Sequence, residues 1–239
     1  MMAHCAILYA QRFTISKYEL GAGAGVFVYQ GDLTPSRLGS YRTLKPTINF
    51  DVSRILSPIF SLRTNLAFGA LRGDDGKYPS PAYRQQRNFN FRTPVFEFSE
   101  LVVADILKDN SAQHPPRVSP YLWTGAGLTF LRIRRDYSRF NAEYFFRESS
   151  TLQGLASDAQ QSLPRVIPVI PMGVGIKYAL SQKIMISAET SYRLTFTDYL
   201  DGFSKAANAK RKDSYQGHTI GIIYRFVSDN SLKCPVFKY

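Results

Sequence analysis

The feature that most constrains this chain is a strict alternation of side-chain type, first visible in the stretch YELGAGAGVFVY at residues 18–29. Every second residue from Tyr18 to Val28 is aromatic, aliphatic or alanine, and the positions between them hold Glu19, three glycines and Phe27. A period of two places successive side chains on opposite faces of a strand. The same period recurs and predicts eight strands, within 18–29, 48–53, 60–69, 89–103, 122–130, 170–178, 184–194 and 220–226.

The three glycines of the first strand, Gly21, Gly23 and Gly25, also invite comparison with a nucleotide-binding loop. A dinucleotide fingerprint needs G-x-G-x-x-G between a strand and a helix. Here Val26 stands where the third glycine of that fingerprint would be, and the period of two runs straight through the stretch. We therefore interpret the glycines as the small residues of one strand face, and we expect no cofactor.

The segment from Phe89 to Val103 has an unclear phase, because its aromatic residues divide between the two faces. Phe89 and Phe91 fall on one face, whereas Phe96 and Phe98 fall on the other. A β-bulge near Pro94 would reconcile them. No segment of the chain shows a convincing amphipathic helical pattern.

The connections between these strands alternate in length. Long gaps (31–43, 71–87, 132–163 and 197–214) alternate with tight turns near 56–57 and 181–182 and a medium gap at 104–117. This order is typical of an up-and-down barrel with long loops at one end and short turns at the other. A soluble up-and-down barrel could share it.

The two faces of the strands favour a membrane barrel over a soluble one. One face is almost wholly apolar, and the other mixes glycine, serine and threonine with charge. Glycine weakens an exposed strand but relieves crowding in the narrow lumen of an eight-stranded barrel. The fold class predicted is therefore all-β, an eight-stranded antiparallel up-and-down transmembrane barrel of outer-membrane type. The charges of the inward face are expected to form a polar network that closes the lumen: Glu19, Arg63, Lys177, Glu189, Arg193 and Arg225.

Aromatic residues near the ends of the strands are expected to form the girdles that mark the two membrane interfaces. The residues assigned to these girdles are Tyr18, Tyr29, Tyr121, Trp123, Tyr178, Tyr192, Tyr224 and Phe226.

The chain is expected to divide into three parts. Residues 1–10, MMAHCAILYA, resemble the late part of a secretory signal, although an apolar first strand would read similarly. Residues 17–226 form the barrel and residues 227–239 a periplasmic tail, because an even number of strands places both termini on the periplasmic side of the outer membrane. The two cysteines, Cys5 and Cys234, and the three histidines are scattered without metal-ligand spacing.

The chain is basic, with 30 Lys and Arg against 18 Asp and Glu and a formal charge of +12. Such a balance suggests a polyanionic partner. In the segment RIRRDYSRF four arginines are candidates for contacts with lipopolysaccharide phosphates, and a merely solvated loop is the alternative: Arg132, Arg134, Arg135 and Arg139. A lipid-facing barrel excludes nucleic acid as the partner.

Three stretches together resemble a known family: YELGAGAGVFVYQGDL, SPYLWTGAGLTFLR and the long segment from Ile167 that ends in TDYLDGFS. They are similar to PorG-type outer-membrane barrels of the Bacteroidota type IX secretion system, a DUF6089-like family. The resemblance covers about Lys17 to Phe226 and implies an integral outer-membrane barrel. It also implies a partner, the periplasmic ring built from PorK- and PorN-type proteins, and it brings no catalytic residues.

The motif TDYLDGFS, with Asp198, Tyr199, Asp201 and Gly202, follows the seventh expected strand. Its two carboxylates could bind calcium or act as an acid–base pair, but a calcium loop needs more oxygen ligands at close spacing. A loop with a turn at Asp201-Gly202 is the preferred interpretation.

A non-enzymatic component of the secretion system is therefore expected, with a small structural barrel like the OmpA membrane domain as the alternative. A lipid-modifying barrel enzyme is disfavoured, because neither His114 nor His218 has an evident nucleophile and orienting acid beside it.

Overall fold

The computed structural model describes residues 17–36, 38–107, 110, 116–147, 149–207 and 212–226. The expected signal remnant (1–10) and tail (227–239) lie outside these residues, as do both cysteines and His114. Eight long strands dominate the described chain: β1 (Tyr18–Gln30), β2 (Lys45–Ile55), β3 (Phe60–Asp74), β4 (Asn90–Asp105), β5 (Val118–Leu131), β7 (Val166–Ala179), β8 (Ile184–Thr195) and β9 (Ser214–Arg225).

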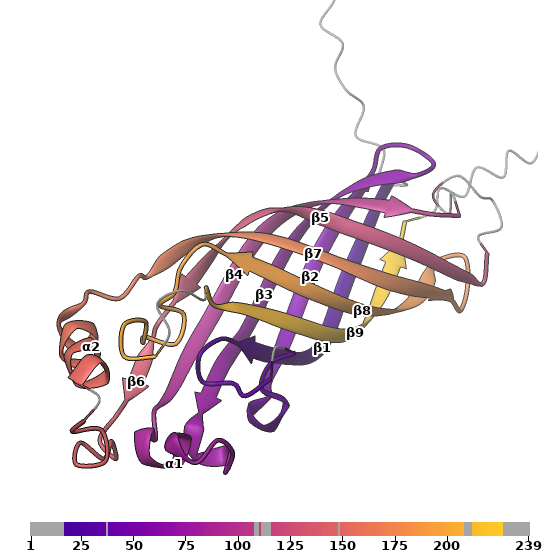
Figure 1. Ribbon diagram of the computed structural model, residues 1–239. Coiled ribbons are helices and arrows are strands. Elements are labelled where there is room, and N and C mark those ends of the chain that lie inside the picture. Colours follow the sequence, from indigo (N-terminus) through magenta and orange to yellow (C-terminus); the bar gives the residue numbers. More distant parts are fainter. Residues whose placement is uncertain are drawn as a thin grey trace, which may run out of the picture.

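These eight strands form a closed antiparallel barrel (Figure 1). Each strand pairs with its neighbours in the chain order β1-β2-β3-β4-β5-β7-β8-β9, and β1 pairs with β9 to close the ring. In the closing pair Glu19 stands opposite Arg225 and Gln30 opposite Ser214. The predicted up-and-down barrel is thus confirmed.

The two ends of the barrel differ. At one, here called the turn end, the connections are 56–59, 106–117 and 180–183. At the other, the loop end, they are 31–44, 75–89, 132–165 and 196–213. These connections carry five short elements: η2 (Tyr41–Thr43), η3 (Asp75–Lys77), α1 (Tyr83–Arg87), β6 (Arg134–Asp136) and α2 (Ser149–Gln160). Figure 1 shows α1, α2 and β6 gathered at this end.

The helices were not expected from the sequence. In α2 the segment SSTLQGLASDAQ holds only two leucines among small and polar residues, so its apolar face is narrow. None of the helices within the described residues is long and apolar enough to span a membrane.

The outward face of the barrel is apolar. Every one of the eight barrel strands exposes large hydrophobic side chains, for example Leu20 on β1, Phe50 on β2, Val174 on β7 and Ile222 on β9. In water such a surface would be unfavourable, whereas it matches the hydrocarbon core of a bilayer. The barrel is therefore of the transmembrane, outer-membrane type.

Strand β4 contains no bulge, contrary to the sequence interpretation. Its register with β3 is continuous from Asn90 opposite Asp74 to Ala104 opposite Phe60. Phe91 therefore points inward while Phe96 and Phe98 point outward, and both orientations are compatible with one regular strand because the inward face turns apolar near the loop end. Continuous alternation also places Glu97 and Asp105 inside the barrel and Glu100 outside it.

Three of the expected girdle residues are instead inside the barrel. Tyr29, Tyr121 and Trp123 are buried, because each shares the inward phase of its strand. Glycines make room for them: a Cβ at Gly173 would lie 2.6 Å from the Trp123 ring, and Gly175 faces Tyr121 just as closely. Gly173 and Gly175 on β7 thus accommodate the large side chains of the adjacent strand β5.

Candidate functional site

Charged side chains on the inward face form ion pairs within the lumen. The structure places all six residues of the expected polar network there, together with two partners not expected from the sequence, Glu97 and Asp105. Four close ion pairs result: Arg225–Glu19 at 2.6 Å, Arg63–Glu189 at 2.7 Å, Lys177–Asp105 at 2.7 Å and Arg193–Glu97 at 3.3 Å.

The pair between Arg63 and Glu189 spans the barrel from β3 to β8. Tyr121 on β5 donates a hydrogen bond from its hydroxyl to Glu189 Oε1 at 2.6 Å. The Arg63 guanidinium lies 5.5 Å from the centre of the Tyr121 ring and 3.8 Å from the Asp51 carboxylate. Buried charges are tolerated when paired and hydrogen-bonded in this way.

Glu97 on β4 joins a second set of strands. It accepts hydrogen bonds at Oε2 from Arg193 Nε at 3.3 Å and from the Tyr215 hydroxyl at 2.7 Å. The sequence interpretation missed Glu97 because the phase of β4 was unclear. Unbroken alternation from Leu101 back through Val95 would have identified it.

The lumen at this level is closed. The cavity among Phe27, Arg63, Trp123, Glu189 and Arg193 has a volume of about 10 Å³, on the order of a single water molecule. The side chains around this cavity therefore fill the lumen at this depth.

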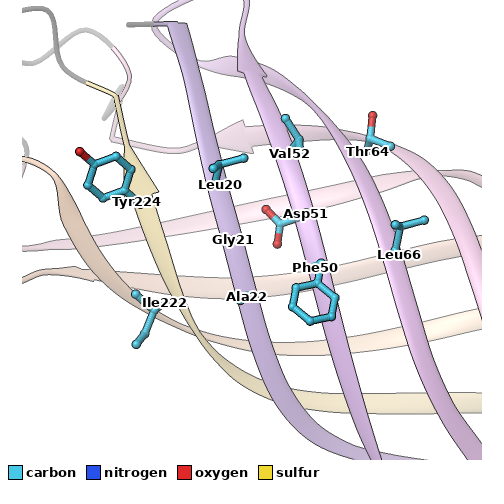
Figure 2. Close-up of a pocket in the computed structure, with 10 residues that line it drawn as sticks. All are labelled: Leu20, Gly21, Ala22, Phe50, Asp51, Val52, Thr64, Leu66, Ile222 and Tyr224. Carbon is cyan, nitrogen blue, oxygen red and sulfur yellow. The ribbon is translucent and has the colours of Figure 1, made fainter. Parts of the chain in front are cut away.

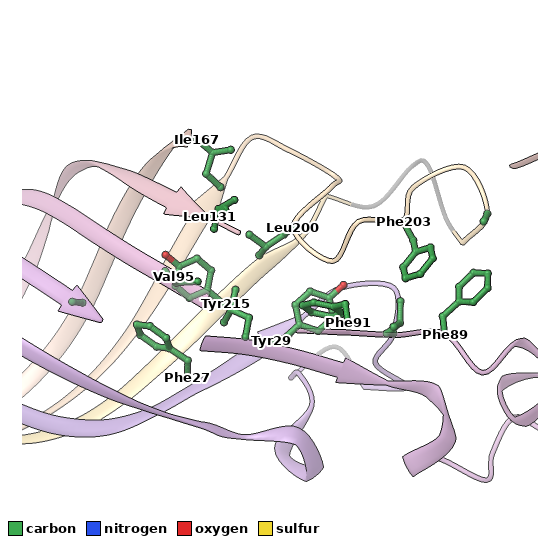
Figure 3. Packing of buried hydrophobic residues seen from close by; sticks show 14 residues of the cluster. Phe27, Tyr29, Phe89, Phe91, Val95, Leu131, Ile167, Leu200, Phe203 and Tyr215 are labelled. Carbon is green, nitrogen blue, oxygen red and sulfur yellow. The ribbon is translucent and has the colours of Figure 1, made fainter. Parts of the chain in front are cut away.

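Near the loop end the barrel interior changes from charged to apolar, and we call this region the apolar cap (Figure 3). Phe89 and Phe203 stack with their ring centres 4.3 Å apart, and Tyr29 meets Phe91 edge-on at 4.7 Å. The buried residues of the cap come from both strands and loops: Phe27, Tyr29, Leu33, Ala67, Leu71, Phe89, Phe91, Val95, Leu131, Ile167, Leu200, Phe203, Ala206 and Tyr215.

The motif TDYLDGFS lies in this cap. Gly202 has a φ of +86°, a conformation that favours glycine. The Asp201 carboxylate accepts a hydrogen bond from the Phe203 backbone N–H at 2.8 Å, and Arg135 donates to the Gly202 carbonyl at 2.8 Å. This turn directs Asp201 into the protein and Phe203 onto Phe89.

Asp201 and Asp213 share the hydroxyl of Tyr29, which lies 2.6 Å from Asp201 Oδ2 and 2.8 Å from Asp213 Oδ1. A hydroxyl donates only one proton, so one of these two contacts requires a protonated carboxyl. Burial raises the pKa of both carboxyls well above the usual range, and the charge of Asp201 adds to the rise at Asp213. The buried triad therefore retains a proton that an exposed pair of carboxylates would lose.

Asp158, at the end of α2, ties this helix to the same loop. Its carboxylate accepts hydrogen bonds from the backbone N–H groups of Ser204, Lys205 and Ala206 at 3.1, 3.2 and 2.9 Å, and from the Tyr199 hydroxyl at 3.2 Å. Ser204 also donates to Asp198. Asp198 and Tyr199 thus stabilise the conformation of the loop. Within the described residues no cluster of three or more acidic, histidine or cysteine side chains is arranged to hold a metal ion.

A second cluster of buried charged residues, which the sequence analysis did not predict, lies in the connection after β3. Asp75 accepts from Arg84 at 2.8 Å and from Arg87 at 2.7 and 3.0 Å. The same two arginines donate to the backbone carbonyls of Asp32 and Thr34 in the loop after β1. Two loops far apart in the chain are joined in this way.

The four arginines proposed for lipopolysaccharide lie in different surroundings. Arg132 and Arg135 line a groove of about 710 Å³ together with Arg165, which the sequence interpretation did not include. Arg134 and Arg139 are exposed on the same loop without lining the groove.

Comparison with known proteins assigns the chain to a family. The family model described as "Domain of unknown function (DUF6089)" matches residues 2–225. This chain belongs to the DUF6089 family. A search of curated proteins finds no match to this DUF6089 chain.

Several solved structures are similar to the DUF6089 barrel. Neisserial surface protein A is 14% identical with a TM-score of 0.47, covering 88% of this chain and 97% of that one. Ail of Yersinia pestis, in complex with the heparin analogue sucrose octasulfate, is 13% identical with a TM-score of 0.46, covering 87% of this chain and 97% of that one. A major outer membrane protein from Thermus thermophilus is 12% identical with a TM-score of 0.46, covering 87% of this chain and 99% of that one. The strand pairing described above, rather than these likenesses, carries the fold assignment.

Proposed function

We propose that this DUF6089 barrel is a non-enzymatic, outer-membrane component of the type IX secretion system that anchors or organises a periplasmic ring of the PorK/PorN kind. The resemblance of residues 17–226 to PorG-type barrels supports the proposal. In this arrangement the turn end and both termini face the periplasm, and the loop end faces the exterior.

The observation that carries the proposal is the apolar character of the turn end. Each of its three connections exposes a large aliphatic side chain, among them Leu56, Ile106, Leu107 and Leu180, which are 52–58% exposed. Because side chains fill the lumen around the ion pairs, we place the function on the surfaces of the barrel. An apolar turn end is a surface that a periplasmic protein could cover.

Co-purification from native membranes tests the proposal. The variant carrying both Ile106→Asp and Leu107→Asp should retain the folded barrel but recover at least about tenfold less of the ring proteins, since each Asp removes apolar contact and adds charge. Leu38→Asp, on a loop-end residue that is 70% exposed, is the matched control and should leave recovery unchanged.

Recovery of the ring with the double variant at the parental level would exclude this surface, and no recovery with the parent chain would exclude the proposed function. If the parent chain recovers no ring proteins, the alternative function is that of a small structural barrel like the OmpA membrane domain. The filled lumen fits that function equally well.

Of the two histidines considered for the enzymatic alternative, His114 and His218, only His218 lies within the described residues. His218 lies on the outward face of β9, 3.2 Å from the Thr190 hydroxyl and 3.3 Å from the Tyr41 hydroxyl. No carboxylate within the described residues bonds to its ring, so the orienting acid of a hydrolytic triad is missing there. A hydrolytic enzyme would lose lipid-modifying activity in a His218→Ala variant, whereas we expect unchanged membrane lipids.

A contact with lipopolysaccharide is part of the same proposal. The groove bordered by Arg132, Arg135 and Arg165 is lined by groups suited to phosphate, because guanidinium groups bind it bidentately. Vesicles containing lipopolysaccharide should stabilise the parent barrel against heat more than vesicles containing its dephosphorylated form. The Arg132→Gln/Arg165→Gln variant should lose that difference, and an undiminished difference would exclude the groove.

A further inference from the structure

A single carboxylate interrupts the apolar outward face of β4. Glu100 is exposed on that face, between Phe98 and Val102, which are 41% and 48% exposed. The residues opposite it are Thr64 on β3 and Ala126 on β5. Neither neighbour is large enough to cover it.

The depth of Glu100 is close to the middle of the membrane. The outward face of β4 is uncharged from Pro94 to Ala104 apart from Glu100. Glu100 is six positions from Pro94 and six from Ile106, the first residue of the turn-end connection. A tilted strand rises roughly 2.4 Å along the membrane normal per residue, so Glu100 lies about 14 Å from each end of this band. Its surroundings at that depth are hydrocarbon.

Within the barrel the carboxylate is only partly satisfied. Thr64 donates a hydrogen bond to Glu100 Oε1 at 2.6 Å. None of the ion pairs found among the described residues involves Glu100. The outward-facing arginines of β2, β3 and β4, which are Arg54, Arg72 and Arg92, lie toward the strand ends and not at this depth.

An apolar groove of about 480 Å³ continues from this position across the barrel surface (Figure 2). Thr64 forms one border, and Figure 2 shows Ala22 between the larger side chains of Phe50 and Ile222. The groove exists because β1 presents a small residue where its neighbours β2 and β9 present large ones. Groove and carboxylate together form one surface over β9, β1, β2, β3 and β4.

We propose that this surface docks a membrane-spanning segment of a different outer-membrane protein, which places apolar side chains in the groove and a lysine or arginine side chain against Glu100. Acyl chains fill the groove but supply no donor, so lipid leaves the carboxylate unsatisfied. A second copy of this chain offers no cation at that depth on its described strands. The proposal does not depend on the contact with a periplasmic ring, which concerns the turn end.

Site-specific photo-crosslinking in the native cells tests this surface. A photoreactive amino acid replaces Val102 beside Glu100, and a second chain carries it at Val174 on β7, away from the surface. The parent chain should give a protein adduct from position 102 and not from position 174. The Glu100→Leu change should reduce the adduct at 102 by about tenfold, the loss expected for a hydrogen bond to a charged group. The Phe98→Leu change, on the same face, should leave it unchanged.

Barrel folding is followed in the same samples by the shift in gel mobility on heating. Glu100→Leu should fold as well as the parent, since it removes a charge from the lipid face. If it does not fold, mapping the parental adduct decides the question: the adduct should fall in a membrane-spanning segment that carries a lysine or arginine. Adducts with lipid alone, with a second copy of the 27.0 kDa chain or with a water-exposed domain would each overturn the proposal, as would a yield that Glu100→Leu does not change.

Discussion

The barrel is closed twice, by two different kinds of chemistry. Through the membrane it is closed by ion pairs such as Arg63–Glu189, whereas toward the loop end it is closed by stacked aromatic rings such as Phe89 and Phe203. Rigid strands hold facing residues in a fixed register, so opposite charges can be matched one to one across the lumen. Loops have no such register, and apolar packing tolerates their variation more easily than paired charges do.

The difference implies different consequences of mutation. Loss of one member of a lumen pair leaves its partner charged and buried without its closest counter-ion. Because the strands are rigid, this lowers the free energy of unfolding of the whole barrel. Loss of one ring from the apolar cap creates a cavity that the adjacent loops can partly collapse around. We therefore expect global destabilisation from changes in the lumen and local loosening from changes in the cap.

The largest effect is expected for Glu189→Leu. This change leaves the Arg63 guanidinium without its closest carboxylate and the Tyr121 hydroxyl without its acceptor. The free energy of unfolding from vesicles should fall by about 3–5 kcal/mol. Urea titration of the folded barrel measures it.

The double variant Arg63→Leu/Glu189→Leu is the control for this prediction. The double variant removes both charges of the close pair, and of the charges that contact it only the Asp51 carboxylate, 3.8 Å from Arg63, loses its cation. It should therefore recover part of the lost stability. A double variant as unstable as the single one would show that packing, and not the unpaired charge, accounts for the loss.

A smaller and local effect is expected for Phe203→Ala in the cap. Phe203 is fully buried against Phe89, and its removal should cost about 3 kcal/mol of local stability. Limited proteolysis should cut the 196–213 loop faster, while urea unfolding of the strands changes little. Phe146→Ala, on a loop residue that is 79% exposed, should leave cleavage unchanged, and equal loosening in both variants would refute the role of the stack.

The lumen was more predictable from the sequence than the cap, and the reason is physical. A period of two determines which face each residue occupies, so the inward positions of Glu19, Lys177 and Arg225 could be read from the pattern. A bulge was wrongly predicted in β4 because the inward face of this strand changes from charged to aromatic between Glu97 and Phe91. With unbroken alternation, Glu97 and Asp105 would have been found as partners of the predicted cations.

The contacts of the cap could not be predicted, because they join loops that have no periodicity. The Tyr29 hydroxyl meets Asp201 172 residues later in the chain, and Asp158 on α2 binds the backbone after Phe203. The motif TDYLDGFS did predict a turn at Asp201-Gly202. Its buried partner Asp213 lies beyond the motif and carries no local signal.

The mildest change, Asp213→Asn, tests whether the cap retains a proton. Because burial raises the pKa of Asp201 and Asp213, the folded cap binds more protons than the open one above the usual carboxyl pKa of about 4. Stability of the cap should therefore be greatest at low pH and fall as pH rises toward the raised values. The side-chain amide introduced by Asp213→Asn can accept from the Leu200 N–H and donate to the Tyr29 hydroxyl without titrating.

Hydrogen exchange of loop 196–213, corrected for the intrinsic effect of pH, measures this difference. The parent cap should open more readily at pH 8 than at pH 5, whereas Asp213→Asn should flatten the dependence and stabilise the cap by about 1–2 kcal/mol at the higher pH. Asp213→Leu loses the bond to Leu200 and should loosen the cap at both values. A parent cap that is equally protected at both pH values would mean that the triad of Tyr29, Asp201 and Asp213 holds no titrating proton. The stability of the cap would then depend on apolar packing and not on a retained proton.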